Sequence, residues 1–282
     1  MMMQESELRA LISLLEDEDP AIKTHVEQKL FSLGEMVIPT LEKAWEQEGN
    51  EQLQNRIADV IHVIQRQHTI TDLKEWKVSK SNDLLKGWYL VTQYQFPELD
   101  FGIYKRMVNR LVNKIWLELR GGMSVRDKFR IINRMLFERE RFKGVNSHQL
   151  FDPQNYYVNG VMETRKGSPL SLGMLYMIIC NELDIPVHGI LLPGYFVLHY
   201  EDEQLEIFID VYDRGRFFSR RDLKGFLKQK KIEDTQRYYQ ASSKIFIILT
   251  LIQVIIYCYE QRKKSDKVRE FELLIKGIEL RE

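Results

Sequence analysis

Apolar residues recur every three or four positions through the first 67 residues, and this spacing predicts four short helices. The acidic run over 16–20 separates the first two helices. Asp19 can cap the second helix, and Pro20 suits its first position. Gly34 is expected to end that helix, and Pro39 stands near the start of the third. The N-terminal part of the chain is therefore predicted to be all-helical.

The pattern changes twice further along the chain. A polar stretch around 69–83 is the expected linker, and helical spacing resumes from Leu84 to Leu136. From Val187 onward, short runs rich in β-branched and aromatic residues predict strands separated by turns. Two helices, beginning near Ser242 and Ser265, close the chain. Helices, then an antiparallel sheet, then helices indicate an α+β fold.

Composition narrows the range of partners. Hydrophobic residues make up 44% of the chain and charged residues 29%, as in an ordinary globular protein. The formal net charge is zero, so no global field favours nucleic acid or an anionic membrane. The stretch from Arg214 to Lys231 holds eight basic residues and one acid, Asp222. A nucleic-acid face is one interpretation of that stretch, but a solvated helix is the favoured one, and we expect no nucleic-acid partner.

Two features bear on the compartment. The N-terminus lacks the basic and apolar regions of a signal peptide. The apolar segment from Ile245 to Tyr259 is shorter than the ~20 residues that a bilayer requires, which predicts a helix buried between other helices and no membrane partner. Cys180 and Cys258 lie in apolar stretches, which fits a reducing compartment. We therefore expect a cytoplasmic protein.

The most informative segment is 142–216, which carries six short motifs in a fixed order. They are FKGVN (142–146), FDPQNYYVNGV (151–161), RKGSPLSLGMLY (165–176), ELDIP (182–186), LLPGYFVLHY (191–200) and IDVYDRGR (209–216). With these motifs, residues 80–260 resemble the SirB-type branch of the transglutaminase-like superfamily. The first helices, with their acidic Asp-Pro turn, resemble HEAT repeats.

These resemblances imply an organisation in three parts. Residues 1–68 would form a HEAT-like segment. Residues 80–240 would form a transglutaminase-like, papain-like core with a central helix packed on a small antiparallel sheet. Residues 241–282 would form a helical pair of tetratricopeptide-like type. The HEAT-like segment would serve either as a partner-binding surface or as a structural cap.

The resemblance also implies where catalytic residues would stand. Active members of the superfamily place a cysteine in the first turn of the central helix, with a histidine and an aspartate on neighbouring strands. In this chain the cysteine position holds Pro169, the histidine position holds Tyr195, and the aspartate position holds Asp210. Only one of the three catalytic residue types remains. The site is predicted to be vestigial.

Other residues could stand in for the missing nucleophile. Ser168 and Ser171 flank the cysteine position, but a serine needs an adjacent base, and Ser168-Pro169 is typical of a helix cap. Cys180 lies about 16 Å along the same helix from its start, out of reach of the site. Asp210 could orient a catalytic partner or anchor the turn that follows it.

Two functions are consistent with these residues. The first is a non-catalytic interaction or regulatory protein that binds a protein or peptide. The alternative is a divergent hydrolase or acyltransferase that uses Ser168 or Ser171 with Asp210. The sequence contains no CxxC, HExxH or glycine-rich phosphate loop, so we expect neither a metal nor a cofactor.

Overall fold

The computed structural model describes residues 5–80 and 83–279, which form two compact units. The first unit takes the chain up to Glu75 together with Gln93–Glu98, and the second takes Trp76–Thr92 and the chain from Leu99 onward. The domain boundaries suggested by the sequence, 1–68, 80–240 and 241–282, stay predictions.

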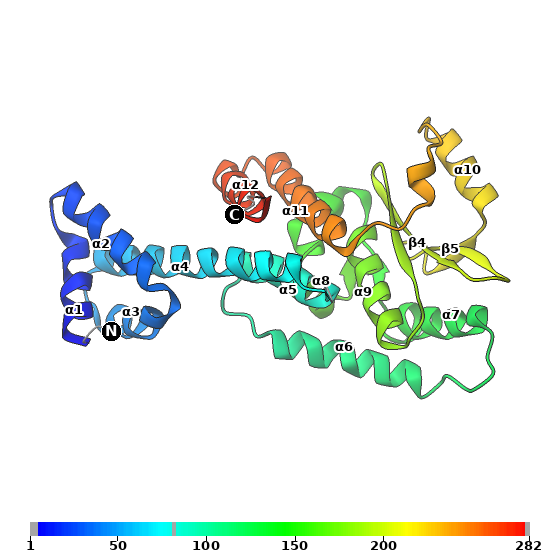
Figure 1. Cartoon of the computed structure of the whole chain (residues 1–282), viewed down its shortest axis with the longest axis horizontal. Helices are drawn as coiled ribbons and strands as arrows, with labels where there is room; N and C mark the ends of the chain where they lie inside the picture. Colours follow the sequence, from blue (N-terminus) through cyan, green and yellow to red (C-terminus); the bar gives the residue numbers. More distant parts are fainter. Residues whose placement is uncertain (1–4, 81–82, 280–282) are drawn as a thin grey trace. The chain divides into compact units, whose positions relative to one another are not determined.

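The first unit is a group of helices around one apolar core (Figure 1). Its elements are α1 (Glu5–Ser13), η1 (Leu14–Glu16), α2 (Pro20–Leu33), η2 (Gly34–Val37), α3 (Ile38–Gln47) and most of α4 (Glu51–Val78). The Asp19 side chain accepts a hydrogen bond from the backbone N–H of Ala21, Pro20 is the first residue of α2, and Gly34 ends α2 with φ +64°. The predicted caps of this helix are confirmed.

The expected linker over 69–83 is wrong for its first part, because α4 continues through Val78 without a break. The side chains of Thr69, Leu73 and Trp76 are buried, on a face of the helix turned by roughly 100–180° from the face that carries Ile57 and Ile64. Polar residues around these positions occupy the exposed face of the helix. Buried contacts on one face are sufficient to hold a helix that looks like a linker in composition.

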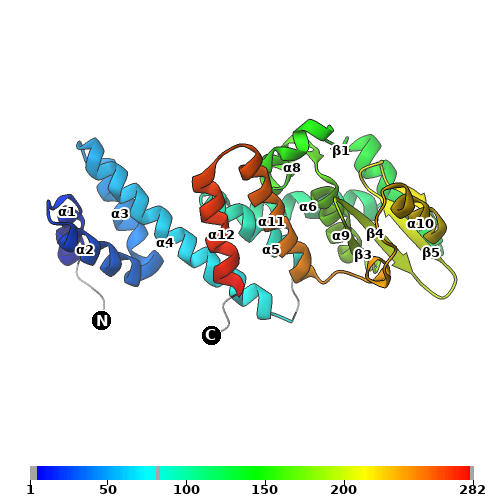
Figure 2. The ribbon, with the colours of Figure 1, turned by 90° about the horizontal axis from the view of Figure 1, so that it is seen from above.

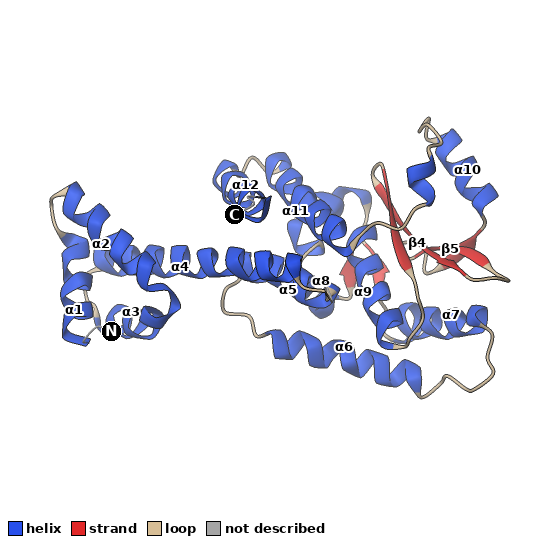
Figure 3. Ribbon diagram, in the orientation of Figure 1, coloured by secondary structure: helices blue, strands red, loops and turns tan. Residues whose placement is uncertain are grey.

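The second unit combines helices with a four-stranded sheet and a two-stranded parallel one (Figure 3). Its helical elements are α5 (Leu84–Gln95, up to Thr92), α6 (Phe101–Trp116), α7 (Val125–Asn133), η3 (Arg134–Arg139), η4 (Ser147–Phe151), η5 (Pro153–Asn155), α8 (Val158–Thr164), α9 (Pro169–Glu182), α10 (Arg220–Gln229), η6 (Gln236–Tyr239), α11 (Lys244–Gln261) and α12 (Ser265–Glu279). Its strands are β1 (Lys143–Gly144), β2 (Lys166–Gly167), β3 (His188–Leu192), β4 (Tyr195–Glu201), β5 (Glu206–Asp210) and β6 (Arg216–Phe218).

The sheet separates two helical layers. Its order is β3-β4-β5-β6 and all neighbours are antiparallel. Neighbouring residues of β4 point to opposite faces: Phe196 packs at Gly173 of α9, whereas Val197 joins the apolar cluster that contains Leu223 and Leu227 of α10. The predicted α+β fold, with a central helix packed on a small antiparallel sheet, is confirmed.

The helix α11 departs from the prediction of burial on all sides. It packs against α12, and the two helices lie side by side in both views (Figures 1 and 2). Its other side leaves Phe246 54% and Tyr257 48% exposed, so the prediction is wrong. Among the described residues, α11 is the one helix long and apolar enough to cross a bilayer by length and composition, and 33% of it is buried in the protein.

Candidate functional site

The start of α9 is closed by two reciprocal hydrogen bonds. The Ser168 hydroxyl accepts from the backbone N–H of Ser171 (3.1 Å), and the Ser171 hydroxyl accepts from the backbone N–H of Ser168 (2.9 Å). Pro169 occupies the first helical position between them. Both serine side chains are fully buried. The capping role predicted for Ser168 is confirmed, and Ser171 is its partner in the same capping box.

A loop from the preceding segment seals this helix start. The Ser171 hydroxyl donates to the backbone oxygen of Asn155 at 2.7 Å, and the N–H of Ser168 reaches the same oxygen at 3.2 Å. The loop is itself fixed, because the Asp152 carboxylate accepts from the N–H of Gln154 (3.1 Å). The DPQN motif therefore holds a turn against α9, as its residue types predict. Each serine hydroxyl is engaged by backbone groups.

Tyr195 and Asp210 form a pair on adjacent strands β4 and β5. The Tyr195 hydroxyl donates to Asp210 Oδ2 at 2.9 Å, while Asp210 Oδ1 accepts from the N–H groups of Tyr212 (3.0 Å) and Asp213 (3.1 Å). Burial and the neighbouring Asp210 carboxylate raise the pKa of Tyr195 well above its ordinary value. The phenol is thus a neutral donor at physiological pH and cannot serve as a general base. Asp210 anchors the turn after β5 through backbone amides.

A cavity of about 330 Å³ opens at the same helix start. Pro169 and Tyr195 line it, whereas Asp210 lines a smaller neighbouring cavity of about 160 Å³ that it shares with Tyr195. The wall of the larger cavity is mostly apolar, with side chains from η4, α9, β3, β4 and α11. They include Leu150, Phe151, Leu170, Leu191, Leu192, Thr250, Val254 and Tyr257. The structure thus brings the positions of Pro169 and Tyr195 together around an apolar pocket.

The contribution of α11 to this pocket was not predicted from the sequence. The rings of Phe151 and Tyr257 lie 6.0 Å apart at its rim, and both side chains are more than one third exposed. The sequence did contain a sign of this second contact, because the run from Ile245 to Tyr259 is apolar on more faces than packing against α12 requires. The second apolar face of α11 lines the pocket.

Neither a histidine nor a cysteine completes a catalytic pair among the described residues. His199 bonds Glu206 at 3.2 Å and stacks on Phe208, and no described histidine is hydrogen-bonded to Ser168 or Ser171. Both cysteines are free thiols and fully buried. Burial raises the pKa of Cys180, and burial together with the Asp152 carboxylate raises the pKa of Cys258 to about 12. Neither thiol is ionised near neutral pH.

One group of side chains has the spacing of a metal site. His199, Glu201 and Glu206 offer ligand atoms that lie within 4.8 Å of one another on β4 and β5. The Arg220 guanidinium contacts both Glu206 oxygens, with Nε at 3.0 and 3.1 Å, and its positive charge occupies the place where a cation would compensate that carboxylate. The sequence motifs did not indicate this group. Its contacts describe an ion network between the sheet and α10.

Comparison with known proteins identifies the superfamily of this chain. Residues 103–253, more than half of the chain, match the model of the transglutaminase-like superfamily. The chain belongs to that superfamily. The matched range contains α9, the sheet β3–β6 and the first ten residues of α11, so it includes the wall of the pocket except Val254 and Tyr257.

Relatives of this superfamily member match over shorter ranges. A UPF0162 protein of Xylella fastidiosa is 29% identical over 133 residues, which is 47% of this chain and 47% of that protein. A UPF0162 protein of Pasteurella multocida is 35% identical over 24% of this chain and 28% of its own length. F-box only protein 21 of Mus musculus is 30% identical over 30% of this chain and 15% of its own length. The matches thus span about half or less of these relatives, and no solved structure matches the chain.

Proposed function

We propose that this chain is a non-catalytic, SirB-type member of the transglutaminase-like superfamily that works as a protein-interaction module in the cytoplasm. In this proposal the pocket at the start of α9 holds an apolar side chain of a partner. Residues 1–68, as a HEAT-like segment, and 241–282, as a tetratricopeptide-like pair, add further binding surface. Pro169, Tyr195 and Asp210 then form a vestigial site.

The observation that carries the proposal is the chemistry at the start of α9. A cysteine nucleophile requires a thiolate beside an imidazole, and these positions hold a proline and a neutral phenol. The nearest hydroxyls, those of Ser168 and Ser171, are buried and already bonded to backbone groups. A serine nucleophile needs a free hydroxyl with a base in contact, and neither condition is met among the described residues.

The character of the pocket supports binding over turnover. Its volume of about 330 Å³ lies at the lower end of the range for ligand sites, and its wall is mostly apolar. The exposed rings of Phe151 and Tyr257 stand at the rim, and aromatic residues are enriched where proteins bind one another. A phenylalanine or leucine side chain of a peptide fits these dimensions.

Catalysis is tested by incubating the full chain with a fluorophosphonate and with peptide amide and ester substrates between about pH 6 and 9. We expect neither labelling nor turnover above background. Labelling of Ser168 or Ser171, lost when that serine is changed to alanine, would establish the hydrolase alternative and overturn the proposal.

Binding is tested by methyl NMR of the full chain, with the blocked tripeptide Ala-Phe-Ala as probe. We expect shifts at Leu191, Leu192 and Val254, which line the pocket. Val254→Arg should abolish them. Gln253→Arg adds the same charge at a neighbouring exposed position that does not line the pocket and should preserve them. Equal loss in both variants, or shifts spread over other methyl groups, would contradict binding at this pocket.

A further inference from the structure

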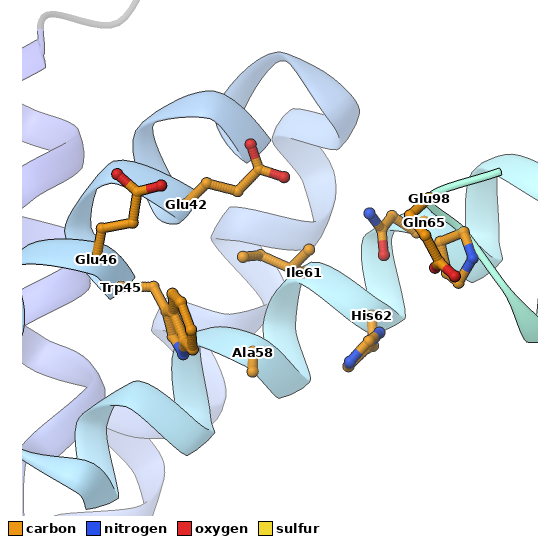
Figure 4. Close-up of a pocket in the computed structure, with 9 residues that line it drawn as sticks. Glu42, Trp45, Glu46, Ala58, Ile61, His62, Gln65 and Glu98 are labelled. Carbon is orange, nitrogen blue, oxygen red and sulfur yellow. The ribbon is translucent and has the colours of Figure 1, made fainter. Parts of the chain in front are cut away.

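The first unit contains a cavity of its own, of about 380 Å³, that lies between α3, α4 and the segment before α6 (Figure 4). Its lining is Glu42, Trp45, Glu46, Ala58, Ile61, His62, Gln65, Pro97 and Glu98. All of these residues belong to the first unit. In Figure 4, α3 contributes two glutamates and the tryptophan at one end, and Gln65 and Glu98 lie at the other.

Trp45 is the unusual residue of this cavity. Its side chain is 44% exposed, although tryptophan is among the residues that proteins bury most completely on average. No ring or cation contact of its side chain exists among the described residues. Ala58 and Ile61 of α4 form the apolar floor beside it, so one face of the indole is open to a ligand.

Three carboxylates line this cavity without being neutralised, two of them on α3 with Trp45 and the third at the other end. Glu42, Glu46 and Glu98 are exposed, and none has an ion pair or side-chain hydrogen bond within the described ranges. Arg66, which follows the lining residue Gln65, has its guanidinium over the Tyr94 ring at 5.9 Å, and neither of these two lines the cavity. The cavity is therefore electronegative and has an exposed π-surface.

The first unit as a whole is acidic, like the cavity. The segments 1–75 and 93–98 contain sixteen Asp and Glu residues against seven Lys and Arg, a formal charge of −9. Because the full chain has net charge zero, the remainder carries +9. The opposite charges of the two units cancel in the net charge of the chain, which is zero. A strongly acidic unit attracts cationic partners and holds them where its field is focused, in a concave site.

We infer that this cavity binds a basic segment of a protein partner and receives one arginine side chain. The guanidinium would stack on Trp45 and donate hydrogen bonds to Glu42 or Glu46, while Glu98 adds negative charge at the other end of the cavity. Arginine fits better than lysine, because its planar group stacks on an aromatic face and pairs with carboxylates in a fixed geometry. The inference rests on the proposed interaction role but uses a different unit from the pocket at α9.

The test uses the full chain and a fluorescein-labelled Gly-Ser peptide with three arginines, compared with the same peptide carrying lysine or glutamine instead. Binding is measured by fluorescence anisotropy at about 150 mM salt, because salt at this concentration screens weak long-range attraction. We expect the arginine peptide to bind most tightly and the glutamine peptide not to bind. Glu42→Gln/Glu46→Gln should weaken binding about tenfold, and Trp45→Leu should weaken it about fivefold.

A matched control separates a site from a general field. Glu18→Gln/Asp59→Asn removes two charges from exposed positions of the same unit outside the cavity, and it should change the affinity less than about twofold. Equal weakening by both double variants, or equal binding of the glutamine peptide, would overturn the inference. Self-association abolished by Glu42→Gln/Glu46→Gln would make the occupant a second copy, which also overturns it. Any of these results would leave binding at the α9 pocket unaffected.

Discussion

Replacing Ser171 with alanine removes the side chain that closes the start of α9. The hydroxyl accepts from the N–H of Ser168 (2.9 Å) and donates to the backbone oxygen of Asn155 (2.7 Å), and it is fully buried. A buried hydrogen bond contributes about 1 kcal/mol net, so the two together contribute about 2 kcal/mol. The N–H of Ser168 and the oxygen of Asn155 still contact each other at 3.2 Å, which keeps the loss below about 3 kcal/mol.

Ser243→Ala is the matched control. The Ser243 hydroxyl caps α11 by accepting from the N–H of Phe246 at 3.1 Å, but this serine is exposed. Water can replace the lost bond, and we expect a loss of about 1 kcal/mol or less. The comparison isolates the effect of burial at the α9 cap, because both substitutions remove a helix-capping serine hydroxyl.

The assay must report the second unit alone, because a chain of two compact units need not unfold in one step. Cys180 and Cys258 are both fully buried in that unit, so their labelling by a thiol reagent at increasing urea concentrations follows its unfolding. We expect the midpoint of Ser171→Ala to fall by about 1 M urea and that of Ser243→Ala by less than half as much. Equal losses would refute the reasoning.

Three further outcomes are expected. Pro169→Cys/Tyr195→His introduces a thiol and an imidazole at the positions proposed for the catalytic pair, and mass spectrometry should show the new cysteine alkylated on the order of 100-fold faster at pH 7 than the native thiols; no difference would mean that these positions do not form a vestigial site. The pKa of Glu206 is lowered in the folded protein, chiefly because its carboxylate accepts a hydrogen bond from Arg220. The ion pair therefore stabilises the fold at pH values above the unfolded pKa of about 4.5, and this stabilisation is lost as the pH falls through the lower pKa of the folded state. Arg220→Gln should therefore reduce stability by up to about 1 kcal/mol at pH 7 and by less at pH 3, measured by urea unfolding, and a loss independent of pH would contradict an ionic origin. Gly160→Ala should destabilise the second unit by about 3 kcal/mol in the same measurement, because a Cβ there would lie 2.1 Å from a backbone oxygen; a neutral result would show that the loop before α8 can move away.

Local signals predicted many elements well. The Asp19-Pro20 start and Gly34 end of α2, and the Ser168-Pro169 start of α9, act through bonds within four residues, so neighbouring sequence contains the information. The β-rich runs became β3, β4 and β5 for the same reason. The short strands β1, β2 and β6 were not predicted, because a strand of two or three residues depends on its partner more than on its own pattern.

The sequence by itself determined the superfamily core and the helix caps, and it alone supports the proposal that Pro169 and Tyr195 stand at the catalytic cysteine and histidine positions. Only the tertiary structure decided what surrounds those positions. It buried both serines of the α9 cap against the Asn155 loop, joined Tyr195 to Asp210, and brought side chains of α11 together with those of α9 and β4 around an apolar pocket at the start of α9. The physical reason is that burial and pocket shape arise from contacts between segments far apart in the chain. The residue types limit which long-range contacts can form, and the packing of the whole unit determines which of them do form.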